Sequence, residues 1–168
     1  HVGLPVVAGG FRTTSHEPGW QACQQGAFVS LATTAAGAHV TGGAGLLGAA
    51  AAFSPQQLVM DSEVFSWNAS IAAGIVVDDE TIALDAIKQV GIGGNYLAQR
   101  HTRRHMKEVW RPRLLDRTMW DAWVASGREG AGEKAIALAD RLLAEHAVVP
   151  LDPRARAAVE RVTADPVP

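Results

Sequence analysis

The order of apolar and polar positions predicts that the chain opens with a strand, a helix and a second strand. An apolar run at 4–8 favours a buried strand, which stops at the glycines of 9–10. After a polar loop, the pattern of 20–36 is helical. The run 38–41 predicts another short strand, which ends in a glycine-rich turn at 42–45. Such a βαβ unit belongs to α/β folds, where the loops after the strands carry the chemistry.

The middle of the chain predicts a long helix over 55–74. Ser54 is its expected cap, Pro55 occupies the first helical position, and Gln57 would complete a capping box. Three polar side chains lie opposite its apolar stripe, and we expect them on a solvated face: Asp61, Glu63 and Asn68.

Shorter helical patterns follow toward the C-terminus. Asp78 is the predicted cap of a helix that ends at Gly91. An amphipathic helix is expected after the glycines of 127–132, and Asp152 with Pro153 predicts a short closing helix. The second half of the chain is therefore expected to be mostly helical.

One glycine motif raises the alternative of nucleotide binding. The run 43–48, GAGLLG, formally matches the G-x-G-x-x-G fingerprint of dinucleotide-binding folds. That fingerprint also needs a second strand that ends in an acidic residue about 20 positions further on. Here a new helix starts instead, so we expect the glycines to allow close packing at a strand end, and nucleotide binding is kept as the weaker alternative.

A pair of histidines raises the question of a metal. His101 and His105 are four residues apart and could share one helix face, as zinc ligands do. The general base of the H-E-x-x-H pattern is missing, and the arginines of 100–104 would repel a cation. We therefore predict no metal site, and expect this basic segment to pair with nearby carboxylates or with an anionic partner surface.

Composition and charge exclude several classes of protein. The chain has 168 residues, 48% of them apolar and 19% charged, which is typical of a globular domain. A net charge of −2 gives no footprint for nucleic acid or an anionic membrane. Cys23 is the only cysteine, which excludes an intrachain disulfide and suits the cytoplasm. No apolar run reaches the roughly 20 residues of a membrane helix.

The start of the chain suggests a piece of a longer protein. It opens almost inside the first expected strand, without an initiator methionine, and supplies few other strands to cover that strand. We expect the C-terminal part of a larger protein, with a complete small domain as the alternative.

Short motifs then follow one another in a recognisable order. They are Gly3-Leu4-Pro5, Val7-Ala8-Gly9, Gln21-Ala22, Ala36-Gly37-Ala38, Gly43-Ala44-Gly45, Phe53-Ser54, Gln57-Leu58-Val59, Asp61, Asp79-Glu80-Thr81, Val90-Gly91-Ile92-Gly93, Asn95, Leu114-Leu115-Asp116-Arg117, and the spacing of Trp123, Ala125 and Gly127. Together they resemble the C-terminal portion of the trimethylamine methyltransferase family, corrinoid-dependent enzymes with a (β/α)8 barrel. The resemblance implies an α/β fold, with the last βα units of a TIM barrel at 1–95 and a mostly helical C-terminal extension at 96–168.

The resemblance also implies a function. It is the transfer of a methyl group from a methylated amine to the corrinoid (cobalamin) of a separate partner protein, with no tightly bound cofactor in this chain. Gly10 matches the position where the archaeal trimethylamine enzymes carry pyrrolysine, so the imine that would hold an amine is absent. This is similar to the non-pyrrolysine branch, some of whose members demethylate glycine betaine. A quaternary amine or betaine is the expected substrate, and a homo-oligomer the expected assembly.

The loop after the first strand supplies the candidate substrate ligands. Carboxylate and aromatic groups bind a quaternary nitrogen by charge and cation–π contact, and Arg12 could hold a substrate carboxylate. The other candidates are Phe11, His16, Glu17 and Trp20. Gly43 and Gly45 would face the corrinoid. The family's Ser-Asp-x-Lys-x-Pro-Asp loop is replaced by FRTTSHEP at 11–18, so the resemblance does not imply which amine is used.

A non-catalytic role is the competing hypothesis. Two strands cannot close a barrel, so the 168 residues alone are not expected to catalyse. Such a fragment would act as an interaction module through its basic segment, 100–117, and its C-terminal helices.

Overall fold

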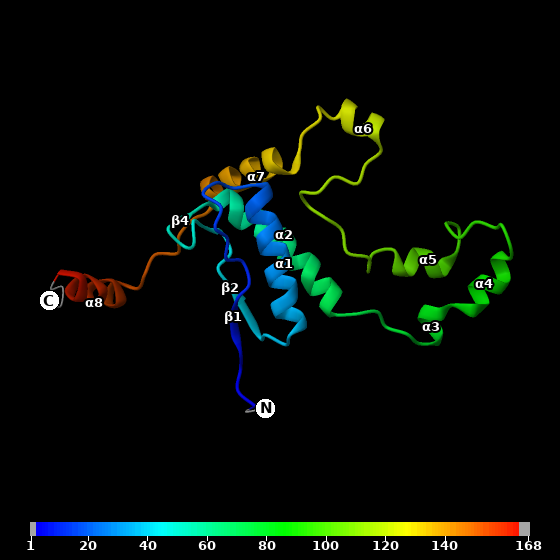
Figure 1. Cartoon of the computed structure of the whole chain (residues 1–168), viewed down its shortest axis with the longest axis horizontal. Helices are drawn as coiled ribbons and strands as arrows, with labels where there is room; N and C mark the ends of the chain where they lie inside the picture. The colour runs from blue at the N-terminus through cyan, green and yellow to red at the C-terminus, as the bar shows by residue number, and fades with distance from the viewer. Residues whose placement is uncertain (1–2, 165–168) are drawn as a thin grey trace.

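The computed structural model of the chain describes residues 3–164 and begins with a parallel pair of strands joined by a helix (Figure 1). Strand β1 (Val7–Gly9) pairs with β2 (Val40–Gly42), and helix α1 (Trp20–Ala35) connects them. The predicted βαβ order is confirmed. Both strands begin two or three residues later than expected, because regular pairing starts only where Val7 meets Val40.

The first strand was expected to be buried, and this expectation is wrong for the described residues. Val7 is 72% exposed and Leu4 is 68% exposed. A two-stranded sheet with α1 beside it leaves most of its surface uncovered, so the apolar side chains of the strand face outward.

The glycine-rich run forms a hairpin. Strands β3 (Leu46–Leu47) and β4 (Ala52–Phe53) pair antiparallel, and the turn between them has positive φ at Gly48, Ala49 and Ala50. A nucleotide pyrophosphate would need a helix N-terminus directly after these glycines. The next helix, α2 (Pro55–Ala72), begins only after the hairpin, so the nucleotide-binding alternative is wrong.

Helix α2 is the centre of the packed part of the molecule. It lies between α1 and α7 (Ala131–Glu145) (Figure 1). Met60 of α2, Leu114 and Ala135 of α7 form the buried apolar cluster, with Cys23 and Leu138 packed against it. This arrangement holds α1, and therefore the loops at its ends, against α2.

The polar face of α2 points inward, which corrects the expected solvated face. Asp61 is 2%, Glu63 8% and Asn68 6% exposed, whereas Leu58 and Phe65 of the apolar stripe are 40% and 53% exposed. Hydrogen bonds to each of the three buried side chains offset part of the desolvation penalty. Asn68 Nδ2, for example, donates to Ser30 Oγ of α1 at 2.6 Å.

An extended arm follows α2 and carries several short helices away from the packed helices (Figure 1). They are α3 (Asp79–Ile82), α4 (Leu84–Val90), α5 (Arg100–His105) and α6 (Trp120–Ala125). Asp78 caps α3 as predicted, but the single helix expected up to Gly91 is wrong. It breaks at Ala83, whose φ of 53° is left-handed, and no glycine marks that position in the sequence.

The chain closes with helix α8 (Pro153–Ala164), whose first turn is capped as predicted. Asp152 Oδ1 accepts the N–H of Arg154 at 2.8 Å. Within residues 3–164, every helix is too short or too polar to cross a membrane.

Candidate functional site

The candidate site lies where β1 and β2 end side by side. Gly9 and Gly42 are paired as the last residues of the two strands, and the Phe11 N–H extends the pairing by donating to the Gly42 carbonyl at 3.1 Å. Since parallel strands end at the same edge of a sheet, the loops that leave them meet there.

Buried hydroxyls order the loop after β1. Thr13 and Ser15 are 5% and 4% exposed. Thr13 Oγ1 donates to Gln25 Oε1 of α1 at 2.6 Å and accepts the Ser15 N–H at 2.9 Å. Gln25 Oε1 also accepts the Thr14 N–H at 3.1 Å. The loop is therefore held on α1 by side chains rather than by regular structure.

The same loop is tied to the hairpin that follows β2. The Gly48 N–H donates to the Ser15 carbonyl at 2.7 Å, and the Ala49 N–H donates to the Thr13 carbonyl at 2.8 Å. The two loops at the strand ends thus form one connected surface.

Gln57 and Asp61 of α2 hydrogen-bond to both loops, the one after β1 and the one after β2. Gln57 Oε1 accepts the Gly19 N–H at 3.1 Å, and Asp61 Oδ2 accepts the Gly45 N–H at 2.8 Å. Gln57 Nε2 joins the two by donating to Asp61 Oδ1 at 2.7 Å. The predicted capping box is therefore only half correct. Ser54 Oγ accepts the Gln57 N–H, but the Gln57 side chain is engaged by Gly19 and Asp61.

Burial sets the ionisation of this network. It raises the pKa of the Asp61 carboxyl, an effect that the hydrogen bonds from Gly45 and Gln57 oppose. It also raises the pKa of the neighbouring Cys23 thiol, with the Asp61 charge adding to the effect and the hydrogen bond from Gln57 opposing it. The thiolate form of Cys23 is therefore disfavoured, and this cysteine is a poor nucleophile.

Gly10 follows the end of β1 and is packed between β2 and α1. A Cβ placed there would lie 3.0 Å from Thr41 Cβ and 3.3 Å from Ser30 Cα. Thr41 Oγ1 is buried and has no hydrogen-bond partner within residues 3–164. The position holds a glycine because no side chain fits there without displacing its neighbours.

The predicted substrate ligands separate into buried and exposed groups. Phe11 is 3% exposed and packs on α1, where a Cβ at Gly26 would lie 3.3 Å from its ring. Trp20, at the start of α1, is 79% exposed. The structure does not bring these two aromatic rings together as one surface.

The charged candidates lie on the exposed side of the loop. Arg12 is exposed and folds back over the strand end, with its Cδ 3.1 Å from where a Cβ of Gly9 would stand. His16 Nδ1 lies 3.3 Å from the corresponding position at Gly48, and Glu17 is exposed. Within residues 3–164, neither Arg12 nor Glu17 forms an ion pair.

The glycines after β2 differ in how much space they leave. A Cβ at Gly42 would meet nothing within 4 Å, and one at Gly43 would make only ordinary contacts with 11–12. At Gly45 a Cβ would lie 2.7 Å from the Phe53 ring, and φ is +79°. Gly45 is therefore enclosed, Gly43 lies beside 11–12, and Gly42 borders open space.

Sequence reasoning missed the residues that organise the loops: Gln25, Gln57 and Asp61. The spacing of Gln57 and Asp61 was a usable signal, because residues four apart share a helix face. The glycine-rich loops were another signal, because their backbone N–H groups need acceptors once buried.

Comparison with known sequences gives this geometry a context. The family described as Trimethylamine methyltransferase (MTTB) matches residues 1–165. The chain is 36% identical to the trimethylamine methyltransferase MttB of Methanosarcina barkeri over 150 residues, which are 89% of this chain and 30% of that protein.

Bacterial relatives match over a similar span. The trimethylamine methyltransferase MttB of Desulfitobacterium hafniense (strain DSM 10664 / DCB-2) is 32% identical, over 95% of this chain and 32% of its own length. The glycine betaine methyltransferase of Desulfitobacterium hafniense (strain Y51) is 31% identical, over 90% of this chain and 32% of its own length. The chain thus spans about a third of the length of the curated relatives it matches.

Proposed function

The chain belongs to the trimethylamine methyltransferase family, and from that premise we propose that it is the C-terminal part of an enzyme that transfers a methyl group from a quaternary amine to the corrinoid of a partner protein. The observation that carries the proposal is the packing of Gly10 at the end of β1. By the resemblance to the family, this position corresponds to pyrrolysine in the archaeal trimethylamine enzymes. Here it has no side chain, and even a Cβ would crowd Thr41 and Ser30.

A quaternary amine as substrate is consistent with a glycine at position 10. A quaternary ammonium has no lone pair with which to attack an imine, so an enzyme for such a substrate needs no imine-bearing side chain. The relative named as a glycine betaine methyltransferase supports this substrate class. The exposed charges of Arg12 and Glu17 suit a betaine, which carries one positive and one negative group.

The role of the side chains is then binding and orientation. A corrinoid bound to the partner protein would supply the nucleophile as Co(I), so the protein itself would not need to supply one. The raised pKa of Cys23 is consistent with this, because its thiol stays protonated. Loop 11–17 would place the substrate methyl group above the ends of β1 and β2.

The glycines at the end of β2 leave space for the flat ring of a corrinoid at 42–43 but not at Gly45. Gly42 borders open space and Gly43 has only ordinary contacts with 11–12, so a corrinoid carried by a partner would meet mainly backbone there. Gly45 does not suit this role, since Phe53 and Leu58 cover it. We therefore place the proposed corrinoid contact at Gly42 and Gly43.

We propose that β1 and β2 are neighbouring strands of a TIM barrel, with the arm and last helices as its C-terminal extension. Two facts support this. The relatives are about three times as long as the chain, and the exposed apolar faces of β1 and α2 need cover.

The test uses the intact protein that carries this chain, mixed with its reduced corrinoid protein and a panel of methylated amines. Glycine betaine or another quaternary amine should methylate the corrinoid, seen as a change in its visible absorption. The 168-residue chain alone should give no reaction, because two strands do not enclose a site. No methylation with any amine would refute the proposal, and trimethylamine as the best donor would refute the substrate class.

Arg12 offers a sharper test of the binding mode. Arg12→Gln should raise KM for glycine betaine by about tenfold or more, because a charged hydrogen bond to its carboxylate is lost. KM for choline, which has no carboxylate, should stay unchanged. Arg141→Gln, on the exposed face of α7, is the matched control. Equal effects on both substrates would contradict a carboxylate contact.

A further inference from the structure

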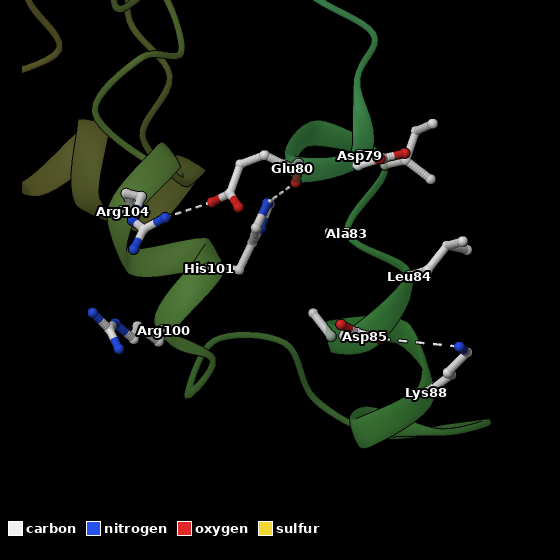
Figure 2. A pocket seen from close by; sticks show the side chains of 11 residues that line it. Asp79, Glu80, Ala83, Leu84, Asp85, Lys88, Arg100, His101 and Arg104 are labelled. Atoms are coloured by element: carbon white, nitrogen blue, oxygen red, sulfur yellow. Dashed lines mark hydrogen bonds and ion pairs between the residues drawn. The ribbon is translucent and has the colours of Figure 1, made fainter.

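A second cluster of side chains that can bind a ligand lies in the arm, away from the strand ends. Figure 2 shows Glu80 of α3 and His101 of α5 pointing toward each other. Both residues line an open cavity of about 500 Å³ that α4 also borders. His105 is one turn further along α5, and its ring centroid is 4.4 Å from that of His101. One donor atom from each of Glu80, His101 and His105 lies within 4.8 Å of the others.

Local structure brings the three residues together. Asp78 and Thr81 form a reciprocal capping box, which fixes the first turn of α3 and so the direction of Glu80. The spacing of four residues puts the two histidines on one face of α5. His101 Nε2 lies 2.7 Å from the main-chain carbonyl oxygen of Glu80, and His105 Nε2 lies 3.2 Å from Glu80 Oε1.

The contact between His105 and Glu108 is also typical of a metal-binding histidine. Its Nδ1 lies 2.8 Å from Glu108 Oε2, so a carboxylate orients the ring from behind while Nε2 faces Glu80. Metal-binding histidines almost always donate the N–H of their other ring nitrogen to a carboxylate, a main-chain carbonyl or water. His105 is also the less exposed partner, with 23% of its side chain accessible against 52% for Glu80.

The arginines around the cluster are the argument against a cation. Arg104 Nη1 pairs with Glu80 Oε1 at 2.6 Å, so this guanidinium competes for the carboxylate. Arg100 points away from Glu80 in Figure 2. The competition therefore comes from one exposed side chain, which can swing into solvent.

We propose that Glu80, His101 and His105 bind one divalent transition-metal ion of the zinc class. Two imidazoles and one carboxylate are a ligand set that zinc accepts, with a fourth position left for water or a ligand from the cavity. Zinc ligands in a tetrahedral site lie about 3.4 Å apart, so donor atoms up to 4.8 Å apart need to approach by at most about 1.4 Å, which side-chain torsions allow. The sequence argued against a metal because the general base of the H-E-x-x-H pattern is missing and the arginines of 100–104 would repel a cation. It did not show that Glu80, on a different helix, lies beside the two histidines.

The test is a titration with Zn²⁺ of the intact protein that carries this chain, after removal of bound metal with a chelator. The wild type should bind one equivalent. His101→Ala, His105→Ala and Glu80→Gln should each weaken binding about tenfold or more, as should Glu108→Gln by loss of the orienting contact. His146→Ala, which removes an exposed histidine elsewhere, is the matched control and should bind as the wild type does.

Arg104→Gln should change the affinity for zinc in the opposite direction, which distinguishes this site from nonspecific binding by histidines. It releases the Glu80 carboxylate, and zinc should bind more tightly than to the wild type. Circular dichroism of each variant shows that it is folded, and the visible absorption of the Co²⁺-loaded wild type measures the site without any substitution. The proposal is overturned by the absence of a one-equivalent site, by unchanged binding in His105→Ala, or by weaker binding in Arg104→Gln.

Discussion

Gly10 and Gly42 stand at the ends of neighbouring strands and differ in what surrounds them. A side chain at Gly10 would press on Thr41 and Ser30, whereas one at Gly42 would enter open space. The first glycine is therefore needed for packing between the sheet and α1. The second leaves the strand end accessible, which is where we propose that the partner's corrinoid approaches.

This difference predicts a contrast between two alanine substitutions. Gly10→Ala should lower the free energy of unfolding by about 1–3 kcal/mol, because the new Cβ overpacks a tight contact. Gly42→Ala should change it by no more than about 0.5 kcal/mol. Urea denaturation of both variants measures the contrast. If the two variants lose the same amount, overpacking at Gly10 is not the cause.

At the scale of elements, Glu63 attaches the arm to α2. Its carboxylate is 8% exposed and accepts the N–H groups of Arg113 and Leu114 at 2.8 and 3.0 Å. Leu114 is thereby held in the buried cluster with Met60 and Ala135. One side chain of α2 thus links three parts of the chain that are far apart in sequence.

Removal of the Glu63 carboxylate should detach residues 113–115 from α2. Glu63→Ala is expected to destabilise the chain by about 1–3 kcal/mol, because buried N–H groups lose their acceptor. Hydrogen exchange at residues 113–115 should become faster, while exchange within α1 changes less. Glu145→Ala, at the exposed end of α7, is the control. Unchanged exchange at 113–115 in Glu63→Ala would show that the carboxylate does not hold the segment.

At the scale of the whole molecule, two carboxylates act on stability with opposite signs. Hydrogen bonds from Thr118 and then Lys134 lower the pKa of Asp116 to about 2. Its contribution to stability is therefore complete above the unfolded value of 3.8 and is lost as pH falls toward 2. Burial raises the pKa of Asp61, so its contribution decreases as pH rises above 3.8.

The acid limb of the stability curve should therefore depend on Asp116. Asp116→Asn should flatten the fall in the free energy of unfolding between about pH 4 and pH 2, because the group that takes up a proton there is gone. Asp121→Asn, an exposed residue that forms none of these hydrogen bonds, should leave the slope as it is. Urea denaturation at several pH values gives the slopes, and an unchanged slope in Asp116→Asn would contradict this assignment.

Much of the secondary structure was predictable from particular residues. Trp20, Ser54, Asp78 and Asp152 mark helix starts that the structure confirms within a residue. Capping and glycine stops act over a few residues, so their signal is present in the sequence. The break at Ala83 had no such signal, since alanine rarely takes a left-handed conformation.

The loops at the ends of β1 and β2 were predictable in place but not in detail. The sequence located the loop after β1 and the glycines after β2, because both follow apolar runs. It did not show that Asp61, Glu63 and Asn68 are buried, or that Glu80 meets His101 and His105. Each of these pairings joins residues 20 or more positions apart, or depends on which face of α2 meets α1.

Local pattern therefore predicts the first βαβ unit and most of the helix starts, and the order of the short motifs indicates the family to which the chain belongs. The tertiary structure decides which face of each helix is buried, because a polar face can be buried where the neighbouring segments supply hydrogen-bond partners. For α2 those partners are the N–H groups of Gly45 and of residues 113–115 and the hydroxyl of Ser30. Only folding brings them to the helix.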